Sequence, residues 1–81
     1  MKVSYEQAKH IVLDAYSDSI VTSGMRLRGG YLFSIQPKNW NKNEILLDPF
    51  FKVDGSTGQL TEYSPVMNPE EFKQALQNVI E

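Results

Sequence analysis

Hydrophobic residues recur at helical spacing near the start of the chain. Ser4 and Gln7 have the spacing of a capping box, which predicts that a helix begins after Ser4. Val3, just before the cap, is placed to pack on Ala8. The apolar stripe consists of Ala8, Ile11, Val12, Ala15 and Tyr16. Because these positions lie three or four residues apart, we expect one face of this helix to cover a core.

The same pattern returns near the end of the sequence. Asn68 is placed as a helix cap, Pro69 as the first helical residue, and Glu71 as the partner of Asn68 in a second capping box. Met67 is placed to pack on Phe72. The stripe consists of Phe72, Ala75, Leu76, Val79 and Ile80. A second amphipathic helix that includes this whole stripe is therefore expected.

Between the two helical patterns, hydrophobic residues alternate with a period of two. In residues 31–36, one face of a predicted strand carries Tyr31, Phe33 and Ile35. Residues 20–28 are ambiguous, because they fit either a further strand or a linking segment.

Residues 54–58 have the composition of a hairpin turn, and strand-like residues 50–53 and 60–63 flank them. Gly58 can adopt the left-handed conformation that such a loop needs, and the Asp54 side chain can accept hydrogen bonds from the loop amides. The segment is therefore predicted to be a β-hairpin.

A hairpin closed by Asp54 and Gln59 fixes which side chains share a face. The pairs expected on one face are Val53 with Leu60 and Phe51 with Glu62. Phe50 and Tyr63 then fall on the other face. A slip of one residue would exchange the two sets.

Together these elements predict one α+β domain over residues 1–81. The expected order is helix, three antiparallel strands, helix, with residues 20–28 as a candidate fourth strand. We expect both helices to pack on one face of the sheet. The other face, with Phe50 and Tyr63 at one end, is then expected to be open.

The composition restricts the classes of function. The 81 residues carry a net charge of −2, whereas nucleic-acid-binding proteins usually carry a basic excess. The sequence has no cysteine, which excludes disulfides, thiol nucleophiles and cysteine zinc sites. It shows neither a signal-peptide pattern nor the ~20 apolar residues of a membrane span. We therefore expect a cytoplasmic protein that binds neither nucleic acid nor membranes.

The sequence contains no pattern that predicts catalysis, a metal site or a cofactor. His10 is the only histidine, and no serine or cysteine nucleophile is suggested by its surroundings. Asp48 precedes a proline and Asp54 begins a turn, so structural roles explain both carboxylates. Residues 54–58 lack the ligand pattern of a calcium loop and the lysine of a phosphate loop. We expect a protein that is not an enzyme.

Five residues are candidates for contact with another protein. Trp40, the only tryptophan, lies in a polar loop, where it either anchors a partner or folds back over the edge of the core. Phe50 and Tyr63 belong to the sheet face that is expected to be open. Arg26 and Arg28 can supply positive charge to an acidic partner.

Residues 31–35 and 49–60 resemble the strand and hairpin of PepSY-type domains, whose turn reads Val-Asp-x-x-Thr-Gly as positions 53–58 do here. The chain is also similar to small bacterial immunity-type proteins, which carry the same helix, strand and hairpin. The chain departs from PepSY-type domains because it has no export signal and no second copy of the unit. The resemblance implies a binding or inhibitory module, and it carries over no catalytic residue.

These observations predict a non-enzymatic protein-binding module of a bacterium or a phage. An immunity or inhibitor role is its most specific form. Two alternatives stay open. One is a small-molecule-binding or regulatory domain of a larger system, which a deep pocket would favour. The other is a homodimeric structural or assembly protein, which would show a mass that depends on concentration.

Overall fold

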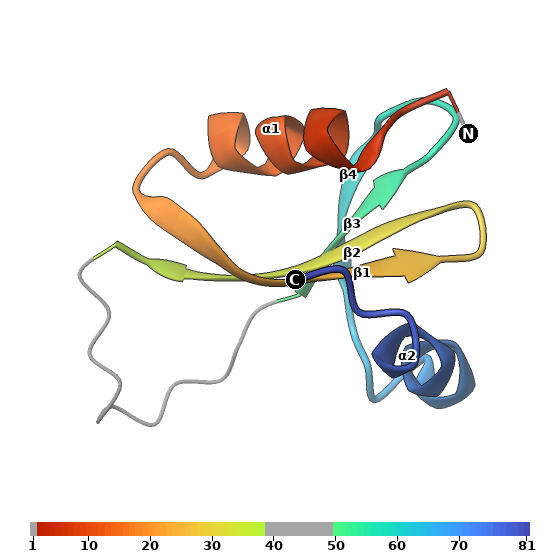
Figure 1. Cartoon of the computed structure of the whole chain (residues 1–81). Helices are drawn as coiled ribbons and strands as arrows, with labels where there is room; N and C mark the ends of the chain where they lie inside the picture. The colour runs from red at the N-terminus through yellow and green to blue at the C-terminus, as the bar shows by residue number, and fades with distance from the viewer. Residues whose placement is uncertain (1, 39–49) are drawn as a thin grey trace.

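A four-stranded antiparallel sheet carries one helix on each of its faces in the computed structural model, which describes residues 2–38 and 50–81 (Figure 1). The elements are α1 (Tyr5–Ala15), β1 (Ser19–Leu27), β2 (Gly30–Pro37), β3 (Phe50–Asp54), β4 (Leu60–Tyr63) and α2 (Pro69–Leu76). The α+β class and the order of elements are as predicted. The ambiguous residues 20–28 lie largely in β1, so the sheet has the fourth strand.

Helix α1 begins as its capping box predicts. The Gln7 backbone N–H donates to Ser4 Oγ at 3.2 Å, and the Ser4 backbone N–H donates to Gln7 Oε1 at 2.9 Å. The two bonds satisfy two backbone donors at the helix end that the helix itself leaves free. Ala8 and Val12 of the predicted stripe are fully buried, and Val3 packs against the same core.

The strands follow one another across the sheet in chain order, and the predicted hairpin register is confirmed. Val53 lies opposite Leu60, and Phe51 lies opposite Glu62. Asp54 Oδ1 accepts hydrogen bonds from two loop amides, those of Ser56 at 2.7 Å and Thr57 at 3.0 Å. These bonds hold the pKa of Asp54 below its ordinary value, because they stabilise the carboxylate.

Gly58 in this hairpin has a φ of 76°, the left-handed conformation that its position in the turn requires. In the turn between β1 and β2, Gly29 is also in the left-handed region, with a φ of 93°. Both turns therefore rely on glycine.

The helices lie on opposite faces of the sheet, so the prediction that both cover one face is wrong. The core under α1 contains Tyr31, Phe33 and Ile35 of β2. The core under α2 contains Leu32, which the alternation of the strand directs to the other face. Every residue from Gly30 to Gln36 is buried. Strand β2 is therefore a central strand covered on both sides, and such strands are hydrophobic on both faces.

Helix α2 is shorter than its apolar stripe predicts. It ends at Leu76, and the following residues run extended along β1, where Val79 forms a bridge with Met25. Asn68 is the N-cap residue and Pro69 the first residue of the helix, as predicted. The predicted capping box is not formed, because the Asn68 side chain donates to the Ser64 carbonyl at 3.0 Å and makes no bond to the helix. Met67, which was expected to pack on Phe72, is 79% exposed.

Residues 78–81 leave the helical path because they pair with the backbone of β1. The Arg26 N–H donates to the Asn78 carbonyl at 3.0 Å, and the Ile80 N–H donates to the Gly24 carbonyl at 2.7 Å. These bonds satisfy outward-facing groups on an edge strand, which a longer helix would have left unpaired. We refer to residues 78–81 as the C-terminal segment.

Candidate functional site

Two of the predicted contact residues lie beneath a helix. Phe50 and Tyr63 face each other across β3 and β4 as predicted, but both pack against the core under α2. The Phe50 and Phe72 rings meet edge to face, with centroids 5.1 Å apart. The prediction that this face is open is therefore wrong, because α2 covers it.

Burial also affects the Tyr63 hydroxyl. It raises the pKa of Tyr63 to about 12, and the nearby Glu71 carboxylate acts in the same direction. Among the described residues this hydroxyl has no hydrogen bond of standard geometry. Tyr63 therefore acts as an apolar side chain that fixes α2 to the sheet.

Trp40, a candidate anchor, and Asp48, a candidate structural carboxylate, lie outside the described residues.

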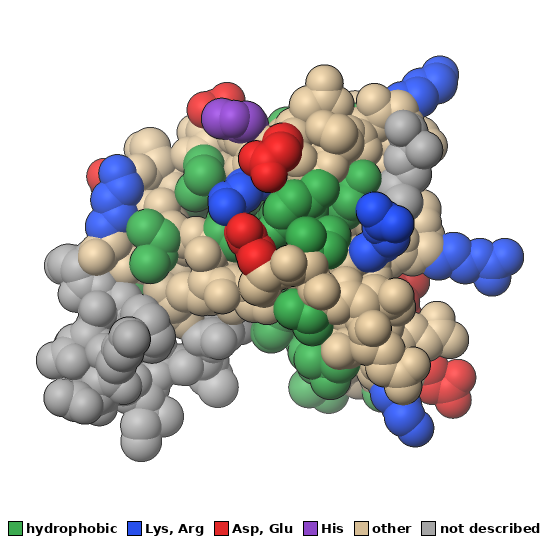
Figure 2. Space-filling model, viewed as in Figure 1, with side chains coloured by type: hydrophobic (Ala, Val, Ile, Leu, Met, Phe, Trp, Pro, Cys, Tyr) green, Lys and Arg blue, Asp and Glu red, His purple; other side chains and the backbone are tan. Residues whose placement is uncertain are grey.

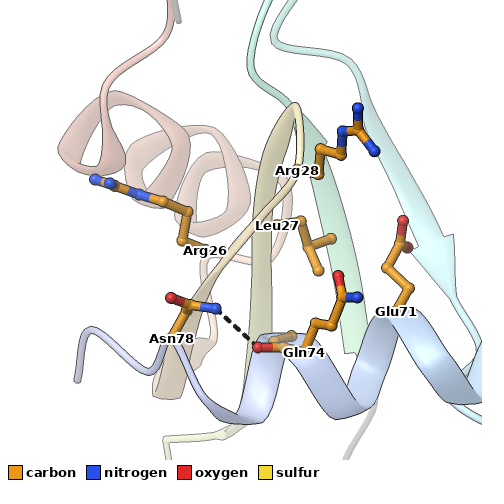
Figure 3. Close-up of a pocket in the computed structure, with 7 residues that line it drawn as sticks. Arg26, Leu27, Arg28, Glu71, Gln74 and Asn78 are labelled. Carbon is orange, nitrogen blue, oxygen red and sulfur yellow. Dashed lines mark hydrogen bonds between the residues drawn. The ribbon is translucent and has the colours of Figure 1, made fainter.

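Arg26 and Arg28 are exposed at the end of β1, as their predicted role requires. They border a hollow of about 250 Å³ between β1 and α2 (Figure 3). In Figure 3 the Leu27 side chain points toward α2 between the two arginines, which diverge to either side. The described ranges contain one ion pair, between Lys9 and Glu81, so neither arginine is paired with an acid there.

The C-terminal segment adds apolar side chains beside Arg26. Arg26, Val79 and Ile80 line a second hollow of about 330 Å³. Val79 is 52% exposed and Ile80 is 42% exposed, so two adjacent apolar side chains reach the surface beside Arg26. We call Arg26, Arg28, Val79 and Ile80 together the Arg26 surface. Figure 2 shows hydrophobic side chains reaching the surface between the two helices, with charged side chains of both signs around them.

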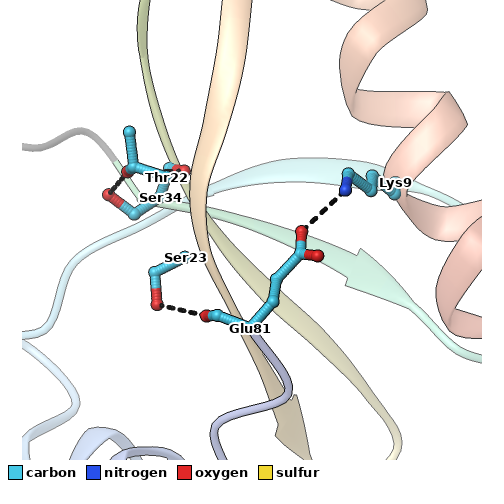
Figure 4. Close-up of polar contacts among 5 residues, drawn as sticks. All are labelled: Lys9, Thr22, Ser23, Ser34 and Glu81. Carbon is cyan, nitrogen blue, oxygen red and sulfur yellow. Dashed lines mark hydrogen bonds and ion pairs between the residues drawn. The ribbon is translucent and has the colours of Figure 1, made fainter.

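Glu81 holds the C-terminal segment in place (Figure 4). Its carbonyl accepts hydrogen bonds from the Gly24 N–H at 3.2 Å and from Ser23 Oγ at 3.3 Å. Its carboxylate lies 2.8 Å from Lys9 Nζ on α1. The bond from Lys9 lowers the pKa of Glu81, because it stabilises the charged form. These contacts fix the position of Val79 and Ile80 on the surface.

Tyr5, the first residue of α1, packs against β1 where the C-terminal segment is also bound. The ring of Tyr5 lies directly over Gly24, so closely that a β-carbon on Gly24 would collide with the Tyr5 hydroxyl. Burial raises the pKa of Tyr5, and the negative charge of Glu81 raises it further. Gly24 is therefore required for contact between α1, β1 and the C-terminal segment.

Close by, β1 contains an irregularity at Thr22 (Figure 4). The register of β1 on β2 shifts between Val21 and Ser23. The Thr22 hydroxyl lies 3.1 Å from both the carbonyl and the hydroxyl oxygens of Ser34, which is buried. Because the extra residue of a bulge bends a strand, this position sets the direction in which the second half of β1 runs.

Val79 and Ile80 were expected in the helical stripe of α2 and not at a surface site, but α2 ends at Leu76. Two adjacent β-branched residues favour an extended segment, and this was the available signal. Within the two described ranges, no group of three histidine, aspartate or glutamate side chains could hold a metal ion. Neither helix there is long and apolar enough to cross a membrane.

A scan against protein-family models and searches of curated proteins and of solved structures find no match to this chain.

Proposed function

We propose that this protein is a non-enzymatic protein-binding module that binds its partner through the Arg26 surface. The observation that carries the proposal is the position of Arg26, which borders both hollows, beside the exposed Val79 and Ile80 side chains. Protein interfaces combine apolar contact area with arginine, which is enriched there over lysine. Such a surface favours a partner that presents carboxylates next to apolar side chains.

The chemistry of the arginines supports an acidic partner. A guanidinium group can donate two parallel hydrogen bonds to one carboxylate, and these bonds are stronger than bonds between neutral groups. Glu71 lines the same hollow, but neither arginine forms an ion pair with it or with another acid among the described residues. Val79 and Ile80 supply the apolar contact area that such a charged pair needs around it.

We further propose that the protein acts in the cytoplasm of a bacterium or in phage-infected cells, as an immunity or inhibitor protein. This version rests on the resemblance of residues 31–35 and 49–60 to immunity-type proteins and PepSY-type domains. An inhibitor of this kind covers a functional surface of its target and performs no chemistry itself.

The test compares two variants of equal charge change. Arg26→Glu reverses a charge on the Arg26 surface, and Lys2→Glu makes the same reversal at an exposed residue before α1. We expect the wild type and Lys2→Glu to retain the same partner from the native cell, and Arg26→Glu to bind the purified partner at least tenfold more weakly. Equal affinities of the two variants would contradict the proposal.

The inhibitor version has its own measurement. The purified partner is assayed for activity or toxicity with increasing amounts of the wild type or of Arg26→Glu. Inhibition that follows binding supports an immunity or inhibitor role, whereas binding without inhibition removes that role and leaves the binding module.

Self-association is the competing use of the same apolar side chains, because Val79 and Ile80 could be buried against a second copy. Sedimentation across a dilution series separates the two uses. A mass that stays at one chain supports a different partner, and a mass that doubles with concentration supports the homodimer.

A further inference from the structure

The two edges of the sheet differ in how much of their backbone is covered. At β1, the C-terminal segment pairs with Gly24 and Arg26. At β4, the last strand in the order of the sheet, no backbone bond outside the pairing with β3 involves Leu60 or Glu62 among the described residues. An uncovered edge presents a row of donors and acceptors to which an extended chain can bind.

The hairpin geometry identifies which groups of β4 point outward. The Asp54 N–H donates to the Gln59 carbonyl at 3.0 Å, so Gln59 faces β3. Residues of a strand alternate between its two neighbours, so Thr61 also faces β3, whereas Leu60 and Glu62 face away from it. The free edge therefore offers the N–H and carbonyl groups of Leu60 and Glu62.

The side chains at this edge give it a chemical character. Leu60 and Glu62 lie on the α1 face, because their partners Val53 and Phe51 belong to the core under α1. Leu60 is half-buried and packs against that core, whereas Glu62 is exposed. On this face the edge thus presents one apolar and one acidic side chain, two positions apart.

Charged side chains of both signs lie near this edge. On the opposite face, the Glu71 carboxylate lies close enough to Tyr63 to raise its pKa. The nearby basic residue, Lys52, lies one strand further in, opposite Thr61, and its charge acts on Asp54. An incoming strand therefore meets the acidic Glu62 on the α1 face, and both Glu71 and Lys52 on the α2 face.

We propose that β4 is a second binding site, which takes an extended basic segment of another protein as a fifth, antiparallel strand. In that arrangement the residue opposite Glu62 comes two positions before the residue opposite Leu60. The preferred segment accordingly has the order basic, any residue, apolar. Its backbone gains hydrogen bonds to Leu60 and Glu62, and its lysine or arginine pairs with the Glu62 carboxylate.

A second copy of this chain fits the edge less well. In a two-fold pairing centred on Thr61, each Glu62 lies opposite Leu60 of the other copy and has no basic partner. In a pairing centred on Glu62, two carboxylates face each other, which is destabilising. The net charge of −2 on each chain opposes both arrangements.

The test uses two synthetic eight-residue peptides of alternating threonine and valine. One carries lysine two positions before a central valine, and the other carries glutamate in place of the lysine. Binding is followed by the backbone amide signals of the full chain in nuclear magnetic resonance. We expect the lysine peptide to shift the signals of Leu60 and Glu62, to slow their hydrogen exchange, and to bind about fivefold more tightly than the glutamate peptide.

Two variants and a control complete the test. Glu62→Lys is expected to reverse the preference between the peptides, and Glu62→Pro to remove binding, because its lost N–H points outward and not toward β3. Glu6→Lys makes the same charge change on α1 and should behave as the wild type. If Glu62→Pro does not fold, the reversal by Glu62→Lys still decides the matter.

Three results would overturn the proposal. They are the absence of peptide-dependent shifts at Leu60 and Glu62, shifts that appear at Arg26 and Val79 in their place, and shifts that depend on protein concentration without any peptide. The Arg26 surface is tested with a different partner and different variants, so either site can fail without the other.

Discussion

Gly24 is the residue at which three separate parts of the chain meet. The Tyr5 ring covers it from α1, its carbonyl accepts from the Ile80 N–H at 2.7 Å, and its N–H donates to Glu81. Its φ is not in the left-handed region, so the requirement for glycine here comes from space and not from backbone conformation. The absence of a side chain lets α1 and the C-terminal segment approach the same point of β1.

We expect Gly24→Ala to lower the free energy of unfolding by about 1–3 kcal/mol, the range for overpacking a filled site. Tyr5→Phe removes the hydroxyl nearest to the new methyl group, so Gly24→Ala with Tyr5→Phe should recover part of the loss. Tyr5→Phe alone should cost little, because the buried hydroxyl has no hydrogen bond of standard geometry among the described residues. Denaturant unfolding of the four proteins measures the coupling. Strictly additive effects would show that Tyr5 and Gly24 do not meet.

At the scale of elements, local signals predicted α1 and the β3–β4 hairpin correctly. The capping box of α1 and the Asp54 turn are each complete within a few residues, so no distant contact could change them. The end of α2 depended on a distant contact. Val79 and Ile80 fit a helical stripe, but the free edge of β1 competed for their backbone, and this competition cannot be read from residues 68–81 alone.

For the candidate site, too, the predictions that needed only local information agree with the structure, and those that needed distant contacts do not. Exposure of Arg26 and Arg28 followed from their charge and position, and the structure agrees. The prediction that the sheet face of Phe50 and Tyr63 is open was wrong, because it required knowing which face α2 covers. Which face of a sheet a helix covers depends on the assembled fold and not on the sequence of the helix. One local signal was present, because the unbroken apolar run of Tyr31, Leu32 and Phe33 favours a strand that is covered on both sides.

The contacts of Phe50 lead to a prediction about α2. Phe50→Ala removes the ring that meets Phe72, and we expect a loss of about 2 kcal/mol, below the range for fully buried phenylalanine because Phe50 is half-buried. Amide hydrogen exchange should become faster in α2, while α1 from Ala8 onward keeps its protection. Tyr63→Phe is the matched control, and its effect should stay within about 0.5 kcal/mol. Equal acceleration in both helices would contradict the separation of the two cores.

The contact between α1 and the C-terminal segment predicts a dependence on pH. The pKa of Glu81 is lower in the folded protein, so the pair with Lys9 stabilises the fold above the ordinary glutamate pKa of about 4.3. That contribution disappears as the pH falls through the lowered pKa. Both side chains are partly exposed, at 28% and 39%, so the contribution at neutral pH should be below about 1 kcal/mol.

Lys9→Met measures this contribution. Its loss of stability relative to the wild type should be largest at pH 7 and should shrink as the pH falls below the ordinary glutamate pKa, with Lys2→Met as the control for removing a charge. A difference that stays constant from pH 7 to pH 3 would show that Lys9 acts through packing and not through its charge.

The whole molecule is a sheet between two small hydrophobic layers that share only their strands. Tyr31 and Phe33 pack under α1, and Leu32 packs under α2, although the three residues are consecutive. Each proposed binding site also lies at its own edge of the sheet: the Arg26 surface at β1, and the free backbone at β4. The two backbone edges are therefore separated by the width of the sheet, whereas Glu71 of α2 lies near Tyr63 of β4 and also lines the hollow beside Arg26 and Arg28.

Strand β2 consequently carries two adjacent reporters of different surroundings. An isotope label in the Leu32 methyl groups would sense loosening or rotation of α2, and a label in the Phe33 ring would sense the same events at α1. One peptide bond joins the two residues. A disturbance that changes the spectrum of one label and not of the other would therefore show that it does not pass through the thickness of a single strand.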